Sequence, residues 1–216
     1  MTKIEIPKSV TIRNGRLYTI SVDSNSVYGE DVLKMDGKFY REWEPKRSKI
    51  SAALKNGLRH FPFNYDTNLL YLGASSGTTV SHLSDIIVNG RIYAIELSYD
   101  PFLKLMRLAE RRKNIYPILE DANLIEKYSF FVEKVGTLYQ DISQRNQIQI
   151  FNSTVEYFHE IKEALLVMKI RSITSRGSDT EILKKSISEI NAFSVKQIVD
   201  LKPYSVGNYM LYLERS

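Results

Sequence analysis

The sequence contains no cysteine, which excludes disulfide bonds and thiolate metal sites throughout its 216 residues. Its three histidines, His60, His82 and His159, lack the spacing of a metal-binding motif, so no metal is expected. No apolar run approaches the roughly 20 residues that a helix needs to cross a bilayer, so no membrane association is expected. The first residues, MTKIEIPKSV, lack the apolar core of a signal peptide. We therefore expect a cytoplasmic protein that uses a cofactor.

Charge is unevenly distributed along the chain, whose formal net charge is +5 and whose pI is near 9.2. This balance favours a polyanionic partner only weakly, because many basic proteins bind no nucleic acid. One short stretch nevertheless gathers several cations: Lys46, Arg47, Lys49, Lys55 and Arg59. A second group closes a helix-like segment: Arg107, Arg111, Arg112 and Lys113. The second group has an ordinary explanation, since cations near a helix C-terminus complement the helix dipole.

Residues 1–44 carry the signals of a small β-rich domain. Asn14-Gly15 and Asp36-Gly37 each separate two strand-like runs, and both dipeptides favour a two-residue hairpin turn. Two such hairpins are not stable alone, so we expect them to pack on residues 45–216, the predicted main domain. There Ser48 is placed to cap a short helix that Gly57 ends.

From residue 68 onward, short apolar strands alternate with segments of helical periodicity. Strands are predicted over residues 69–72, 91–96, 115–119, 135–139, 164–170, 195–201 and 208–213. Helices are predicted over 78–86 and 101–112, and around residues 148–158 and 183–190. One face of the 101–112 helix is expected to carry Phe102, Leu105, Met106 and Ala109. The pattern predicts an α/β fold with a mostly parallel sheet covered on both faces, and one of the last two strands should run antiparallel.

A glycine turn links the strand over 69–72 to the helix over 78–86. Gly73 and Gly77 allow the backbone to turn sharply and to approach a ligand without a Cβ in the way. The helix that follows directs unsatisfied amide donors at the same gap. Tight packing of the strand against the helix is the alternative explanation for such a turn. The turn is not the G-x-G-x-x-G fingerprint, and its polar centre suits the amino-acid end of S-adenosylmethionine at least as well as a pyrophosphate.

Carboxylates follow the next two strands at the same edge of the predicted sheet. Glu96 lies 19 residues after Gly77, where nucleotide-binding folds place the carboxylate that accepts hydrogen bonds from ribose hydroxyls. Asp121 follows the third strand, where its carboxylate can accept a hydrogen bond from an adenine amino group. A solvated glutamate at a strand end is the alternative for Glu96. A Walker-type lysine is absent, which argues against nucleoside triphosphate hydrolysis.

Several longer segments resemble the fibrillarin family and its archaeal fibrillarin-like members. These are YLGASSGTTVSHLSDI, YAIELS and NIYPILEDA, preceded by REWEPKRSKISAAL and followed by YQDISQRNQ and MKIRSI. The resemblance covers about residues 38–204 and implies a Rossmann-like class I S-adenosylmethionine-dependent methyltransferase sheet with an antiparallel C-terminal strand and a small β-rich N-terminal domain. It also implies 2′-O-methylation of ribose in ribosomal, and sometimes transfer, RNA. In that family a box C/D guide RNA selects the nucleotide, a Nop-domain scaffold protein holds the enzyme, and a kink-turn-binding protein organises the RNA.

The resemblance assigns roles to individual residues. With the turn residues, the expected cofactor contacts are Gly73, Ala74, Gly77, Thr78, Thr79, Glu96, Leu97, Asp121, Ala122, Asp141, Ile142, Ser143 and Gln144. Three members of the family's lysine, aspartate, lysine and histidine site match Lys49, Asp141 and Lys169. RNA contacts, mainly to phosphate and sugar, are expected from Lys46, Arg47, Lys55, Arg59, Arg171 and Arg176.

Ordinary explanations compete with the catalytic ones. Lys49 is alternatively a solvated helix residue, and Asp141 alternatively caps a helix that begins near Ser143. Lys169 is harder to explain away, because it follows an apolar run and a strand interior seldom tolerates an unpaired charge. Methyl transfer is an in-line displacement, so alignment should supply most of the catalysis, with Lys169 and Asp141 facing the methyl group.

Two departures from the family pattern bear on activity. Asn208 stands where family members carry a histidine, and an amide cannot titrate. The glycine-rich turn usual before the Lys169 strand is replaced by a short charged connection over 160–163, which can shift the register of that strand. Two rival functions therefore stay open: a methyltransferase of the same fold that acts on a small molecule or protein, and a non-catalytic assembly protein.

Overall fold

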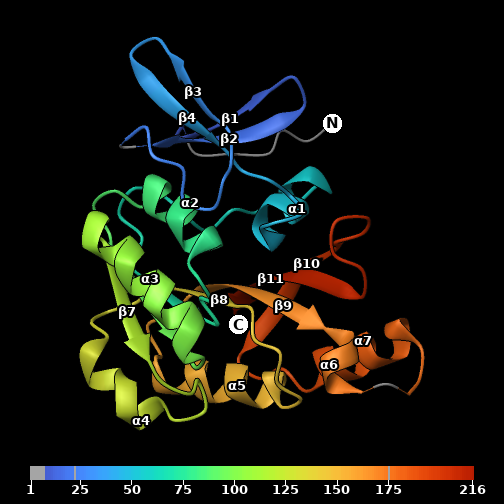
Figure 1. Cartoon of the computed structure of the whole chain (residues 1–216). Coiled ribbons are helices and arrows are strands. Elements are labelled where there is room, and N and C mark those ends of the chain that lie inside the picture. Colours follow the sequence, from blue (N-terminus) through green and yellow to red (C-terminus); the bar gives the residue numbers. More distant parts are fainter. Residues whose placement is uncertain (1–7, 22, 175) are drawn as a thin grey trace.

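The structure is a computed structural model that describes residues 8–21, 23–174 and 176–216, so residues 1–7 of the predicted N-terminal domain lie outside the described part. A four-stranded sheet has the order β1-β2-β4-β3, and a seven-stranded sheet has the order β10-β11-β9-β8-β5-β6-β7. Figure 1 shows the small sheet above α1 (Lys49–Lys55) and α2 (Thr78–Ile86), which separate it from the large sheet. Within the described residues, no helix is both long and apolar enough to cross a membrane.

Two tight hairpins form the small sheet, as the sequence predicts. Its strands are β1 (Val10–Arg13), β2 (Arg16–Ser21), β3 (Val32–Met35) and β4 (Lys38–Glu42). Arg13 pairs with Arg16 across the first turn, and Met35 pairs with Lys38 across the second. Asn14 has a φ of 48° and Asp36 a φ of 49°, so both turns use the left-handed backbone that Asn, Asp and Gly tolerate. The predicted boundary at residues 44/45 falls between β4 and α1 and stays a prediction.

The large sheet is the predicted α/β sheet. Its parallel strands are β5 (Leu69–Leu72), β6 (Ile92–Glu96), β7 (Ile115–Leu119), β8 (Thr137–Gln140) and β9 (Glu163–Lys169). The last strand, β11 (Asn208–Arg215), lies antiparallel between β9 and β10 (Phe193–Asp200). Its pairing with β9 runs without a shift from Glu214 opposite Glu163 to Asn208 opposite Lys169. The charged connection before β9 therefore leaves the strand in register.

Helices cover both faces of this sheet. One face buries apolar side chains of α1, α2 and α3 (Tyr99–Arg111). The other face buries side chains of α4 (Ile125–Tyr128), α5 (Gln147–Tyr157), α6 (Ile170–Ile173) and α7 (Asp179–Ser188). The short α4, the 3₁₀ turn Ser129–Phe131 after it, and α6 were not predicted, since pieces of three or four residues carry no periodicity.

Two details of the helices differ from the prediction. In α3 the buried residues are Leu105 and Leu108, whereas Met106 is 40% exposed, because the contact side of the helix is turned toward Gly77. Ser48 does occupy the N-cap position of α1, but its hydroxyl makes no capping bond. It instead accepts a hydrogen bond from the Thr79 hydroxyl at 3.1 Å, which ties the start of α1 to α2.

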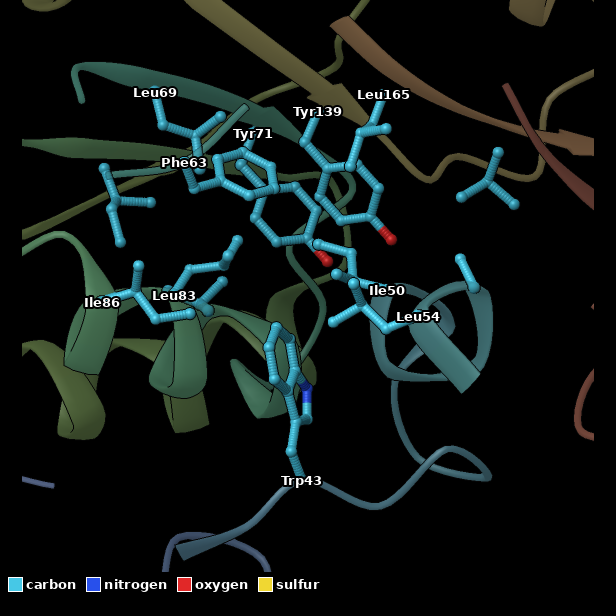
Figure 2. Close-up of a cluster of buried hydrophobic side chains, with 14 of the residues drawn as sticks. Trp43, Ile50, Leu54, Phe63, Leu69, Tyr71, Leu83, Ile86, Tyr139 and Leu165 are labelled. Atoms are coloured by element: carbon cyan, nitrogen blue, oxygen red, sulfur yellow. The ribbon is translucent and has the colours of Figure 1, made fainter. Parts of the chain in front are cut away.

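Trp43 joins the small sheet to the helices beneath it. Figure 2 shows this side chain standing between α1 and α2, with Tyr71 and Tyr139 reaching toward the same region from the large sheet. Trp43 is fully buried and stacks on the imidazole of His82 at 5.2 Å between ring centroids. Burial, together with the nearby Arg41 and Arg112, holds the pKa of His82 well below its usual value, so this ring stays neutral.

A buried ion network holds the small sheet against α2. The Asp85 carboxylate lies 2.9 Å from Arg41 Nη1 and 2.6 Å from Arg112 Nη1, and it accepts a 2.7 Å hydrogen bond from the Thr19 hydroxyl. Glu30 pairs with the other side of Arg41 at 2.6 Å. The side chain of Arg112 is almost fully buried, so its role is this ion pair rather than the helix-dipole role predicted from sequence.

Asp85→Ala should destabilise the fold strongly, because it leaves Arg41 and Arg112 as buried cations without this carboxylate. We expect a loss of about 3–5 kcal/mol in the free energy of unfolding, measured by urea denaturation. Asp31→Ala is the matched control, since the Asp31 side chain is 71% exposed and lies 3.7 Å from Arg16; its cost should stay below about 1 kcal/mol. Equal effects of the two substitutions would contradict a structural role for the network.

Candidate active site

A cavity of about 470 Å³ lies at the carboxyl ends of the parallel strands. Most of the predicted site residues line this cavity: Lys49, Gly73, Ala74, Thr78, Thr79, Glu96, Leu97, Ala122, Asp141, Ile142, Ser143, Gln144 and Lys169. Gly77 and Asp121 are not among its lining residues, and their contacts with a cofactor stay predictions. Ser75 and Ser76, from the polar centre of the glycine turn, also line it, as do four residues that the sequence did not single out: Tyr71, Ile95, Ser98 and Glu120. The strand-end pattern therefore locates the cavity.

Gly77 and Gly73 are needed for packing within the protein. A Cβ on Gly77, whose φ is +88°, would lie 2.7 Å from Leu108 Cδ2, so the side of Gly77 that a Cβ would occupy is filled by α3. A Cβ on Gly73, whose φ is +83°, would lie 2.7 Å from the Asp141 carbonyl oxygen. The close-packing alternative thus accounts for both glycines, and Gly73 sets how near the end of β8 approaches the turn.

Glu96 is anchored by the glycine turn that faces it. Its Oε2 accepts a 2.7 Å hydrogen bond from the Ser75 amide, and its Oε1 accepts a 2.8 Å bond from the Ser98 amide. The residue is only 8% exposed, so it is not the solvated glutamate of the alternative interpretation. Each carboxylate oxygen keeps lone pairs that can accept further hydrogen bonds from a ligand in the cavity.

Asp121 is hydrogen-bonded to a neighbouring loop. Its Oδ1 accepts hydrogen bonds from the Asn123 amide at 2.9 Å and from Gln144 Nε2 at 3.3 Å. Burial opposes its ionisation, but the bonds from Asn123 and Gln144 outweigh that effect and lower the pKa of Asp121. Asp121 therefore positions Gln144, which does line the cavity.

The Asp141 carboxylate forms an ion pair with each of the two predicted lysines. Lys49 Nζ lies 2.9 Å from Asp141 Oδ2, and Lys169 Nζ lies 2.8 Å from Asp141 Oδ1. Lys169 also donates to the Asp141 carbonyl and to the Ser143 hydroxyl, both at 2.9 Å. The helix after Asp141 begins at Gln147, so Asp141 caps no helix, and Lys49 is ion-paired rather than free in solvent.

Gln147 supports the backbone at Lys169 and was not predicted from the sequence. It is fully buried at the start of α5, where its Oε1 accepts a 3.1 Å bond from the Lys169 amide. Its Nε2 lies 3.3 Å from both the Lys169 and the Gln144 carbonyl oxygens. Gln147 precedes Phe151 by four residues, so a polar residue on the buried face of this helix was the available signal.

Comparison with known proteins decides the family. The Fibrillarin family model matches residues 9–215 of the chain. A fibrillarin-like rRNA/tRNA 2′-O-methyltransferase of Picrophilus torridus is 52% identical over 202 residues, which cover 94% of this chain and 95% of that protein. The chain belongs to the fibrillarin family.

Solved fibrillarin structures share this fold. The structure of a fibrillarin/Nop5p complex superposes with a TM-score of 0.90 at 41% identity, covering 98% of this chain and 100% of the other. The structure of Aeropyrum pernix fibrillarin with natively bound S-adenosyl-L-methionine gives a TM-score of 0.85 at 36% identity, covering 95% and 97% of the two chains. These matches confirm the predicted fold class, with its methyltransferase sheet and N-terminal antiparallel sheet.

In this fibrillarin-family protein, Asn208 lies directly opposite Lys169 in the pairing of β11 with β9. Its Nδ2 donates a 2.7 Å hydrogen bond to the Ser205 hydroxyl, and it does not line the cavity. Two tyrosines lie nearer the site. Burial, and then the negative charge of Asp141, raise the pKa of both Tyr71 and Tyr139 well above the usual value. Both phenols therefore stay protonated and cannot serve as bases.

The six predicted RNA contacts of this fibrillarin-family chain are spread over the surface. Arg47 lines the cavity, and its guanidinium lies 5.4 Å from the ring centroid of Tyr28. Lys55 donates to the Gly15 carbonyl, and Arg171 pairs with Asp179 at 2.5 Å. The others, Lys46, Arg59 and Arg176, are exposed. Their contacts with RNA stay predictions.

Gly73→Ala should destabilise this fibrillarin-family fold, because the new Cβ meets backbone atoms that cannot rotate away and the φ of +83° disfavours alanine. We expect a loss of about 1–3 kcal/mol in the free energy of unfolding, measured by urea denaturation. Gly136→Ala is the control, since a Cβ there meets nothing within 4 Å. A Gly73→Ala protein as stable as this control would refute the proposed close approach of Asp141.

Proposed function

We propose that this chain transfers a methyl group from S-adenosylmethionine to ribose 2′-hydroxyls of ribosomal and transfer RNA. The observation that carries the proposal is the Asp141 carboxylate held between Lys49 and Lys169, at the edge of a cavity that also contains Glu96. The names of its relatives, rRNA/tRNA 2′-O-methyltransferases at 52% and 49% identity, support the same reaction.

The cavity fits the proposed cofactor in size and polarity. Its volume of about 470 Å³ falls within the usual range for small-molecule sites. Glu96 and Glu120 offer acceptors for ribose hydroxyls and an amino group, while the first turn of α2 offers unsatisfied amide donors for a carboxylate. When bound, S-adenosylmethionine supplies a methyl group activated by its sulfonium.

Asp141, Lys49 and Lys169 align the hydroxyl that receives the methyl group. The carboxylate accepts a hydrogen bond from the hydroxyl, which orients the oxygen lone pair for in-line attack. As the new O–C bond forms, the proton of the hydroxyl would pass to that carboxylate and from there to solvent. The two lysine amines, each within 2.9 Å of the carboxylate, would stabilise the negative charge that develops on the oxygen. Gln147 keeps Lys169 in place through the backbone of β9.

We propose further that the enzyme works in a box C/D particle in the cytoplasm, where a guide RNA selects the nucleotide. A Nop-domain scaffold protein would hold it, as the solved fibrillarin/Nop5p complex suggests for a relative at 41% identity, and a kink-turn-binding protein would organise the RNA. In this proposal residues 1–44 form the small domain and residues 45–216 the methyltransferase domain.

Asp141→Asn and Lys169→Ala should each lower kcat for methyl transfer by about 10²–10⁴-fold, because each removes a group that aligns or stabilises the reacting oxygen. The assay measures labelled methyl incorporation into target RNA by the particle reconstituted with guide RNA. Lys162→Ala, at an exposed position before β9, is the control and should match the native rate. Native rates in both site variants would remove the catalytic assignment, and an inactive native particle would favour the assembly role.

Glu96→Ala should weaken S-adenosylmethionine binding roughly 10- to 100-fold, since a charged acceptor is lost from a nearly buried position. Isothermal calorimetry measures the dissociation constant, and urea denaturation checks that the protein stays folded without the bonds that the Ser75 and Ser98 amides donate to Glu96. Glu126→Gln in α4 is the control, because Glu126 is exposed and outside the cavity. Unchanged affinity in Glu96→Ala would rule out the ribose assignment.

A further inference from the structure

A second cavity, of about 350 Å³, adjoins the first. The two share Arg47, Ser76 and Thr78, so they are continuous around the start of α2. The second cavity is also lined by Lys104, Arg107 and Arg111 of α3, and none of its lining residues is acidic. Four cationic side chains thus meet in one recess without a carboxylate to balance them.

The three cations of α3 occupy one helical face. They are spaced three and four residues apart, a spacing at which like charges destabilise a helix by a few tenths of a kcal/mol per pair. All three side chains are exposed, and within the described parts of the chain none has an ion-pair partner. Arg111, in the last turn, complements the helix dipole, but Lys104 and Arg107 lie too far from that end to do so. Asp100 and Glu110 also lie in α3, but neither forms an ion pair with Lys104 or Arg107 in the described part of the chain, so the repulsion is offset at most in part.

Arg47, the fourth cation of the recess, contacts the aromatic ring of Tyr28. Its guanidinium lies over the ring of Tyr28, whose hydroxyl is 2.9 Å from His82 Nε2 and 3.1 Å from the Glu42 carbonyl oxygen. The small sheet thus fixes the tyrosine, and the tyrosine fixes the arginine. Figure 1 shows α3 beside α2 and below the small sheet, which is where this recess lies.

We propose that this recess, defined by Arg47, Lys104, Arg107 and Arg111, binds backbone phosphate of the RNA strand whose ribose enters the first cavity. The inference rests on the proposed function and adds the position of the strand. The side chains offer hydrogen-bond donors and positive charge, which is the chemistry that recognises phosphate. The single carboxylate of S-adenosylmethionine, proposed above to lie at the first turn of α2, is too little charge for four cations, whereas an RNA strand brings one phosphate per nucleotide.

The test compares Lys104→Gln/Arg107→Gln with Lys127→Gln/Lys162→Gln, a double variant that removes the same charge from exposed positions outside both cavities. Each full-length protein is assembled with scaffold protein, guide RNA and target RNA, and methyl transfer is measured against target concentration at several salt concentrations. The recess variant should raise KM for target RNA about tenfold and lower the slope of log KM against log salt by about 1–2. The control should follow the native protein, and Arg107→Lys, which keeps the charge, should retain most of the native slope.

Two results would overturn the inference while the proposed function stands. In the first, the recess variant has the same KM and salt slope as the control. In the second, calorimetry shows that the recess variant binds S-adenosylmethionine ten times more weakly than the native protein, which would assign the recess to the cofactor. If the native particle transfers no methyl group, the proposed function fails. The salt dependence of target-RNA binding, measured by filter retention on the same particles, then decides the recess by itself. A reduced slope in the recess variant supports it, and an unchanged slope rejects it.

Discussion

The candidate site depends on a single carboxylate that faces two cations at once. Asp141 uses Oδ2 for Lys49 and Oδ1 for Lys169, and its side chain is only 11% exposed. These contacts join α1, β8 and β9, which are distant in sequence. Without that charge, two ammonium groups would face each other at the mouth of the cavity. The position of Asp141 is set in turn by its backbone, which lies against Gly73 more closely than any Cβ would allow.

The small sheet contributes to the same arrangement from a distance. Arg41 and Asp85 fix β4 against α2 through a buried ion pair, and the chain then passes through the buried Trp43. The Ser51 hydroxyl donates a 2.5 Å hydrogen bond to the Trp43 carbonyl oxygen, so α1 begins in a defined place. Lys49 is the first residue of that helix. The ion network beneath the small sheet therefore helps to set the position of the Lys49 amine in the cavity. The small sheet thus has a positioning role as well as a packing role.

Local sequence signals were sufficient wherever structure is determined locally. The Asn14-Gly15 and Asp36-Gly37 turns, the strands and their polar ends, and the helix over 78–86 all follow from turn chemistry and periodicity. Features set by contacts distant in sequence were not predictable in this way. The position of Gly77 against Leu108, the hydrogen bonds of Asp121 with Asn123 and Gln144, and the ion pair of Arg112 with Asp85 are examples. In each case the residue type is compatible with several different contacts. Which contact forms depends on how α3 or a neighbouring loop packs against the residue.

The amide of Asn208, opposite Lys169 at the start of β11, limits how this site can handle a proton. Asn208 cannot titrate, and Tyr71 and Tyr139 are held in their protonated form by burial and by Asp141. At the end of the cavity that contains Asp141, the lining groups that can exchange a proton are then Asp141 itself, Lys49 and Lys169. Such a set is better suited to orienting a hydroxyl than to deprotonating it in advance, because the carboxylate and the amines are already bonded to one another. Under the proposed function, rate enhancement therefore comes chiefly from alignment, so the contacts that fix Asp141 matter more than the basicity of any one residue.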